Sequence, residues 1–156
     1  MSGILKAGDV IAGQEGMAYM EIDGRNEPMF YVKNVNGIVE KQKTQLRTLG
    51  KRGDQNKTIG WAGSGSMVIH KVTSQFVEMA VEYVKTGRDS YFNLTVVNDD
   101  PSSTIGSQRV VLVDVNLDSY PVALLDVDAE ALEEEMDFTF DDLDLIESFK
   151  KPSNFA

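Results

Sequence analysis

The last third of the chain contains a run in which apolar and polar residues alternate. Met136, Phe138 and Phe140 are spaced two apart, and Asp137 and Thr139 fill the positions between them. A period of two is typical of a half-buried β-strand, because successive side chains point to opposite faces. A strand with one apolar face must cover it with another sheet or a helix. The chain is therefore expected to build a layered β structure with these three apolar residues in its core.

Other segments are rich in β-branched and aromatic residues and lie between turn signals. We expect strands at residues 17–22, 28–39, 58–71, 91–97, 109–117 and 120–127. Asp23-Gly24 follows the first of these segments and predicts a two-residue hairpin turn. The pattern therefore indicates seven or eight strands in total.

Two of these segments have features that predict their local geometry. Asn36-Gly37 is interpreted as a bulge or bend within residues 28–39. Residues 109–117 alternate, so one face of that strand is expected to carry Val111, Val113, Val115 and Leu117.

One segment has the period of an amphipathic helix. Apolar residues recur at i, i+3, i+4, i+7 and i+8, and they are Phe76, Met79, Ala80, Tyr83 and Val84. Thr73 or Ser74 can cap the start of this helix, and Gly87 is placed just beyond its end. The helix is expected to pack one face on a sheet.

These elements predict a mainly β fold with one α-helix. We expect an antiparallel β-barrel or two-sheet sandwich with the helix packed on the outside. The length of 156 residues fits a single domain spanning 1–156. The polar tail 148–156 is expected to be flexible.

Charge is segregated along the chain. Between residues 41 and 57 one acid accompanies six cations, which are Lys41, Lys43, Arg47, Lys51, Arg52 and Lys57. Between residues 110 and 149 there are thirteen acids and no Lys, Arg or His. We interpret 41–57 as a long basic loop that could meet the acidic half of a second copy head to tail. The alternative is a mobile basic loop beside a solvated acidic surface.

Composition excludes several classes of protein. The chain has no cysteine, which rules out disulfide frameworks and thiolate metal sites. Its net charge of −10 argues against gripping a nucleic acid, because that requires Lys and Arg to neutralise phosphates. We see no signal peptide and no apolar stretch long enough for a membrane span. Synthesis in a reducing cytoplasm is expected.

The sequence offers little that would support catalysis. His70 is the single histidine and lies at the end of a predicted strand, where a structural role is favoured. The glycine-rich segment 60–66 lacks the Lys-Ser/Thr ending of a phosphate-binding loop. Trp61 within it is expected to pack at a seam between subunits rather than to stack on a ligand. We therefore expect no catalytic, cofactor-binding or metal-binding residues, and no cofactor.

The acidic residues are the remaining candidates for a functional surface. Asp126 and Asp128 would face the same side of a strand at 120–127. A glycosidase pair or a calcium site is disfavoured, because the calcium-loop glycine is missing and no aromatic-lined cleft is indicated. An acidic wall or subunit interface is preferred, with Asp126, Asp128, Glu133, Glu134, Asp141 and Asp142 as candidates.

Several stretches together resemble the tail tube proteins of contractile-tailed phages and phage-like elements, the PBSX-type defective prophages among them. The stretches are HKVTSQFVEMAVEYVKTGRDSYFNLTVVNDDPSS at 70–103 and RVVLVDVNLDSYPVALLDVDAEALEEEMDFTFDDLDL at 109–145. The motif IAGQEG at 11–16 and the layout of residues 40–65 fit the same family.

This resemblance implies a structural role. Tail tube proteins form hexameric rings in which each subunit adds strands to an inner β-barrel, and the rings stack into a hollow tube inside a sheath. The segment 41–57 corresponds to a long loop that reaches the neighbouring ring. The implied partners are copies of the chain itself and the sheath, tape-measure and baseplate proteins, with DNA only as passing cargo. The implied location is the tail of a virion, with no membrane binding.

Three alternatives remain open. The same subunit plan serves R-type bacteriocins and type VI-like injection devices. A small-ligand-binding β-barrel would be a monomer or dimer with room inside its core. An enzyme using the acids would need a paired carboxylate in a cleft. Oligomeric state separates the tube from the other two.

Overall fold

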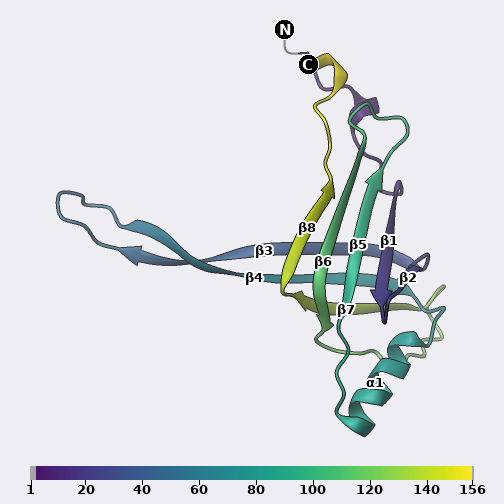
Figure 1. The fold of residues 1–156 in the computed structure, drawn as a ribbon. Coiled ribbons are helices and arrows are strands. Elements are labelled where there is room, and N and C mark those ends of the chain that lie inside the picture. The colour runs from purple at the N-terminus through teal and green to yellow at the C-terminus, as the bar shows by residue number, and fades with distance from the viewer. Residues whose placement is uncertain (1–2, 156) are drawn as a thin grey trace.

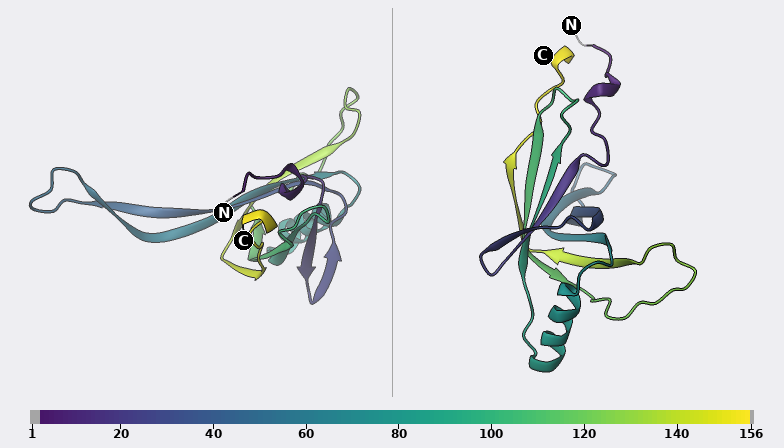
Figure 2. Two further views of the ribbon diagram at one scale, coloured as in Figure 1. Left: turned by 90° about the horizontal axis from the view of Figure 1, so that it is seen from above. Right: turned by 90° about the vertical axis from the view of Figure 1, so that its right-hand side faces the viewer.

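The structure, a computed structural model, describes residues 3–155. Two antiparallel sheets cross one another and share strand β6 (Figures 1 and 2). The first sheet has the order β2-β1-β5-β6-β8, with β1 (Gly16–Ile22), β2 (Arg25–Pro28), β5 (Phe92–Asp99), β6 (Ser107–Leu117) and β8 (Asp142–Glu147). The second has the order β3-β4-β7, with β3 (Val32–Leu46), β4 (Gln55–His70) and β7 (Glu133–Phe140). The expected mainly β fold with one helix is confirmed.

The turn between β1 and β2 forms as its sequence predicts. Asp23 and Gly24 both have positive φ, at 51° and 78°. Two such residues in succession match the twist of the flanking strands, which is why Asp-Gly is favoured there.

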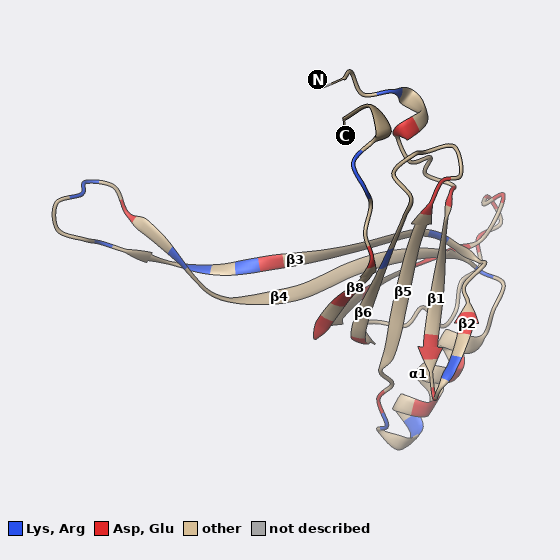
Figure 3. Cartoon of the chain, turned by 45° about the horizontal axis from the view of Figure 1, so that its top comes forward, with Lys and Arg blue, Asp and Glu red and all other residues tan. Residues whose placement is uncertain are grey.

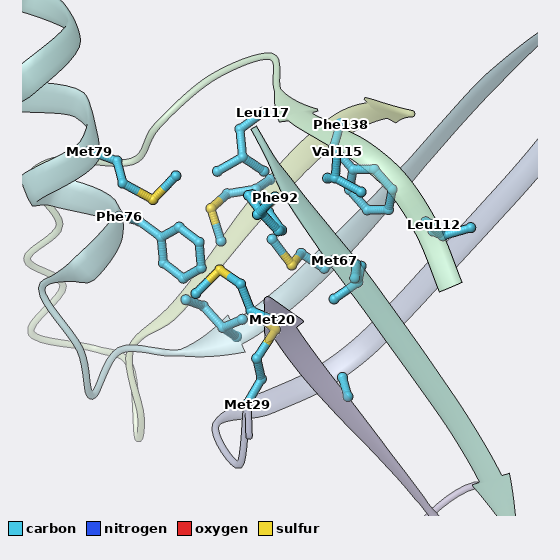
Figure 4. Packing of buried hydrophobic residues seen from close by; sticks show 14 of the residues in the cluster. Met20, Met29, Met67, Phe76, Met79, Phe92, Leu112, Val115, Leu117 and Phe138 are labelled. Atoms are coloured by element: carbon cyan, nitrogen blue, oxygen red, sulfur yellow. The ribbon is translucent and has the colours of Figure 1, made fainter. Parts of the chain in front are cut away.

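The core lies between the two sheets and is closed at one end by the helix (Figure 4). As predicted, the apolar positions of β7 point into it, and Phe138 is 0% exposed. Five of the core residues are methionines, and they are Met20, Met29, Met67, Met79 and Met136. The ring of Phe138 lies so close to Gly65 that a Cβ there would come within 2.6 Å of the ring. Gly65 therefore makes room for Phe138, and Gly63 does the same for Phe140, rather than for a ligand.

Strand β6 departs from the predicted alternation. Its register with β5 pairs Leu112 with Leu94 and Val115 with Phe92, so one extra residue is inserted between them. Asp114 takes a positive φ of 55°, and its amide donates to the Asn93 side chain at 3.2 Å. This β-bulge puts Leu112 and Val115 on the same core face. The expectation that Val111 and Val113 share the face of Val115 was therefore wrong.

The helix α1 (Gln75–Thr86) forms where the apolar period predicts it. Ser74 occupies the N-cap position, but the Thr73 hydroxyl accepts the hydrogen bond from the Gln75 amide, at 3.2 Å. The helix ends at Gly87, whose amide donates to Tyr83. Only the first half of the stripe is buried, at Phe76, Met79 and Ala80. Val84, expected on the packed face, is 75% exposed because the helix extends past the end of the sheets.

Other boundaries differ from the prediction. Residues 120–127 form no strand; they belong to a long connection, 118–132, that projects from the body (Figure 2). Strand β8 was not predicted. Asn36-Gly37 forms regular pairs with β4, and the irregularities of β3 lie instead at Val32/Asn34 and Gln42/Lys43.

Residues 41–57 do not form the long loop that their sequence predicted. The expected loop is mostly strand, because β3 runs to Leu46 and β4 begins at Gln55, which leaves only residues 47–54 as a connection. Together they form a hairpin that projects far beyond both sheets (Figure 1). The polar residues of this segment are compatible with strand structure because neither face of the ribbon is buried.

Candidate assembly surfaces

The projecting part of the hairpin has no support from the rest of the subunit. Strand β4 pairs with β7 only from Gly63 to His70, so residues 55–62 pair with β3 alone. Trp61 and Gln55 are six residues apart, which corresponds to about 20 Å of two-stranded ribbon before the turn. An isolated two-stranded ribbon is marginally stable in water. The ribbon is therefore a surface that needs a partner.

All six predicted cations lie on this projecting hairpin, as Figure 3 shows. Arg47 forms an ion pair with Asp54 at 3.6 Å. Within residues 3–155, the other five (Lys41, Lys43, Lys51, Arg52 and Lys57) form no ion pair. The hairpin therefore carries a positive charge that its own subunit does not neutralise.

The tip of the hairpin also exposes an apolar residue. Leu49 in the 47–54 connection is fully exposed, and Lys51 and Arg52 follow it. A single exposed leucine is common on protein surfaces, so Leu49 is a candidate contact residue only together with the cations that follow it.

An acidic surface lies where β7 turns into β8. Asp141, Asp142 and Asp144 are exposed, and none of them takes part in an ion pair within the described part of the chain. Glu147, farther along β8, is paired with Arg109 at 3.6 Å. Every residue of β8 is exposed, Leu145 and Ile146 among them. This edge strand therefore combines unpaired backbone, apolar side chains and negative charge.

A notch adjoins this acidic surface at the base of the projecting hairpin. Its volume is about 460 Å³, and its lining residues are Trp61, Ala62, Gly63, Thr139, Phe140 and Asp141. Trp61 is 43% exposed, and its ring centroid lies 6.3 Å from that of Phe140. Trp61 therefore packs against Phe140 and leaves part of its side chain accessible to a neighbour; its place at a seam between subunits stays a prediction.

Glu133 and Glu134 lie on opposite faces of β7. Glu133 is partly exposed, and Lys33 donates to it at 2.9 Å, which lowers the pKa of Glu133. Glu134 is only 2% exposed and is paired with Lys71. A buried carboxylate that already has a cation cannot form an acidic wall, so Glu134 is removed from the candidates.

Asp126 and Asp128 do not share a strand face. They lie in the 118–132 connection, where the Asp128 amide donates to the Asp126 carboxylate at 3.0 Å. This local turn explains why an aspartate precedes the bend. The two remain exposed acids on a projecting connection, separate from Asp141 and Asp142.

The outer face of the second sheet carries acidic side chains among mostly small or polar ones. Its central rows align residues of β3, β4 and β7, and these are Asn34, Val68 and Glu135; Asn36, Ser66 and Asp137; and Ile38, Ser64 and Thr139. We call these nine residues the acidic face. They include two acids and no Lys or Arg.

Two buried aspartates tie the N-terminal segment to the β5–β6 connection. Asp9 accepts from the Thr104 hydroxyl at 2.6 Å and amide at 2.9 Å, and these hydrogen bonds lower its pKa. Asp100 accepts from the amides of Ala12 at 3.0 Å and Ser102 at 2.9 Å, which lowers its pKa in the same way. The C-terminal segment joins this end through the Lys150 amide, which donates to Ile105. The flexibility of 148–156 stays a prediction.

The attachment of the N-terminal segment should depend on pH. Because folding lowers both pKa values, these carboxylates add stability above the ordinary aspartate pKa of about 3.9. That contribution is lost as the pH falls below this value and through the lowered ones. We expect the protection factor of the Ala12 amide against hydrogen exchange to drop between pH 6 and pH 3. In an Asp100→Asn variant this dependence should be reduced. Equal protection of the wild-type amide at both pH values would contradict the assignment.

Within residues 3–155 no three His, Cys, Asp or Glu side chains gather as metal ligands. His70 lies at the end of β4, next to Glu133 in register. No described helix is long and apolar enough to span a membrane.

The fold of crossed antiparallel sheets with one helix is shared with chains in solved structures of contractile injection systems. The chain aligns with a chain in the sheath-tube complex of the extracellular contractile injection system PVC with a TM-score of 0.65, at 9% identity, over 89% of this chain and 92% of that one.

Sequence comparison narrows this class to one family. The profile described as phage tail tube protein matches residues 3–147. The phage-like element PBSX protein XkdM of Bacillus subtilis is 46% identical over 143 residues, covering 92% of this chain and 95% of XkdM. The uncharacterized protein YqbM of the same organism is 47% identical over 146 residues, covering 94% and 97%. The chain therefore belongs to the phage tail tube protein family, as its sequence motifs indicated.

Proposed function

We propose that this chain is the repeating subunit of the inner tube of a contractile phage tail or phage tail-like particle, and that copies form hexameric rings that stack into a hollow conduit for DNA. The observation that carries the proposal, besides family membership, is the unsupported basic hairpin. A two-stranded ribbon that extends beyond its own core is only marginally stable in water, so it gains stability when another molecule covers it.

The open edges of the sheets support this proposal. Strand β8 leaves one edge of the first sheet exposed along its whole length, and β3 forms an edge of the second. Exposed edges favour aggregation unless they are paired, and closing them between subunits removes that liability. Contacts between different surfaces close into rings about one axis and extend without limit along another.

The first test is negative-stain electron microscopy of the purified protein over a range of concentrations. Hollow tubes or stacked six-membered rings are the expected result. A strictly monomeric protein that also fails to extend tubes from preformed ends would overturn the proposal.

Reversing the charge at the hairpin tip should impair stacking without unfolding the subunit. In a Lys51→Glu/Arg52→Glu variant, tubes should be fewer and shorter because like charges then meet across the contact between rings. The matched control is Lys150→Glu/Lys151→Glu, an adjacent exposed pair in the C-terminal segment. Electron microscopy measures tube length, and circular dichroism checks the fold. Tubes of normal length and growth rate in the tip variant would show that the tip is not the stacking device.

We further propose that the acidic face lines the lumen. A wall with acids, small hydroxyl side chains and no Lys or Arg repels phosphates and lets DNA slide. This revises the predicted lumen candidates toward Glu135 and Asp137, both exposed on β7. Asp141 and Asp142 fall instead at the edge of the subunit, next to the notch.

Charge reversal on this face should trap DNA. A Glu135→Lys/Asp137→Lys variant should still assemble, and tubes formed with short duplex DNA should retain nuclease-protected DNA that is released by salt. A Glu78→Lys/Glu82→Lys variant, altered on the surface of α1, serves as the control for binding outside the tube. If both variants protect equal amounts of DNA, the lumen lies elsewhere.

The role of a tail tube subunit implies the partners and the location of the protein. The expected partners are copies of the chain and the sheath, tape-measure and baseplate proteins, with DNA as cargo and no membrane contact. The protein would be made in the host cytoplasm and end in the tail of the virion, with no enzymatic activity. An R-type bacteriocin or type VI-like device would use the same subunit plan. A ligand-binding barrel would need space where the apolar side chains of both sheets and the helix form the core.

A further inference from the structure

We propose that the hairpin tip of one copy docks in the Trp61 notch of a second copy, with Leu49 entering the notch and Lys51 and Arg52 facing Asp141 and Asp142. This inference rests on the proposed tube function and identifies the receiving surface for the tip. The tip is the connection 47–54, and the notch is the space at the base of the hairpin described above.

The chemistry of the two surfaces is complementary. The tip presents one fully exposed leucine followed by two cations that have no acid partner in the described part of their own subunit. The notch presents the open side of Trp61 and Phe140 and is bordered by Asp141. One cation lies near the notch, because Lys41 pairs with Trp61 across the hairpin. Asp141, Asp142 and Asp144 outnumber it.

The tip cannot reach the notch of its own subunit. Continuous pairing of β3 with β4 holds the tip about 20 Å or more from Trp61. The contact must therefore form between two copies, and each copy offers its tip to one neighbour and its notch to another. Such a heterologous contact propagates without limit, as a growing tube requires.

A second groove, with a volume of about 630 Å³, is a poorer receiver. It is bordered by Met17, Phe30 and Lys33, and no acid lines it. A tip with two cations would gain no charge pairing there and would meet Lys33. Charge complementarity therefore selects the notch.

Cysteine cross-linking provides the direct test, because the chain contains no cysteine of its own. A Leu49→Cys/Ala62→Cys variant, assembled and mildly oxidised, should form a disulfide ladder that extends beyond dimers. Either single substitution should give no ladder. The control is Leu49→Cys/Leu125→Cys, which moves the second cysteine to the exposed 118–132 connection. A ladder in the control but not in the notch variant would overturn the inference.

Charge exchange provides a second, independent test. Lys51→Glu/Arg52→Glu and Asp141→Lys/Asp142→Lys should each reduce the assembled fraction by about tenfold, because like charges meet at the contact. All four substitutions in one chain should restore tubes. If the combined variant assembles no better than either parent, the tip and the notch do not meet. In that case wild-type tubes would still support the proposed function, whereas absence of wild-type tubes would count against the function itself.

Discussion

Replacing Phe138 with alanine should lower the free energy of unfolding of the unassembled subunit by about 3–5 kcal/mol. The side chain is fully buried among apolar residues of both sheets, and its ring lies on the backbone of Gly65. Removing the ring loses its transfer energy and leaves a cavity that the sheets cannot close, because β7 is fixed by β4 on one side. Urea denaturation followed by circular dichroism measures the change.

Phe30 gives a matched control for this substitution. It is the same residue type, but its side chain is exposed and contacts Tyr31 edge to face. Phe30→Ala should cost less than about 1 kcal/mol, the usual range for a surface substitution with one aromatic contact. Equal losses at the two positions would mean that the inward face of β7 has been assigned incorrectly.

Replacing Lys71 with alanine should destabilise the subunit by about 3–5 kcal/mol, although it removes only one ion pair. The partner, Glu134, is almost completely buried, whereas Lys71 is partly exposed. Without the ammonium group the carboxylate is left in the interior with no opposite charge. Thermal or urea unfolding at neutral pH measures the effect.

The neighbouring pair provides the comparison. Lys33 and Glu133 also form an ion pair, but both side chains are substantially exposed, so Lys33→Ala should cost no more than about 1 kcal/mol. Removing both buried charges in Lys71→Met/Glu134→Met should recover most of the loss, since the buried carboxylate is then gone. A Lys71→Ala loss as small as that of Lys33→Ala would show that Glu134 reaches water.

Local signals in the sequence predicted the elements that local chemistry determines. The alternation around Phe138 identified β7 and its inward face, Asp23-Gly24 identified the hairpin turn, and the period from Phe76 to Ala80 identified α1. In each case the pattern within the segment is sufficient, because a period or a turn dipeptide reflects the backbone of that segment alone.

Features that depend on distant residues were missed. At the bulge, the Asp114 amide donates to the Asn93 side chain on strand β5. The sequence of β6 alone therefore does not predict the bulge. Strand β8 pairs with the edge of β6, and it was missed although Asp142, Leu143, Asp144 and Leu145 alternate as in a strand. The connection 118–132 contains Val122, Leu125 and Val127, whose apolar character suggested a strand although they remain exposed.

The candidate surfaces were predicted unevenly for the same reason. The run of cations predicted a contact surface at residues 41–57, but it could not show that the segment is mostly paired strand. Among the acids, Glu133 and Glu134 are adjacent and chemically alike, and only their orientation in β7 separates the exposed one from the buried one. The alternation with Met136 was the signal that could have placed Glu134 inside.

The unsupported hairpin has a kinetic consequence. A free subunit gains little from ordering this ribbon, so the first two subunits to meet must order it while forming few contacts. In the proposed tube, a subunit that joins an existing end finds a complete ring of receiving surfaces. Initiation should therefore be slow and elongation fast, which gives spontaneous assembly a lag that preformed ends abolish. Such a protein can accumulate at high concentration and begin to polymerise only slowly until a nucleus is supplied.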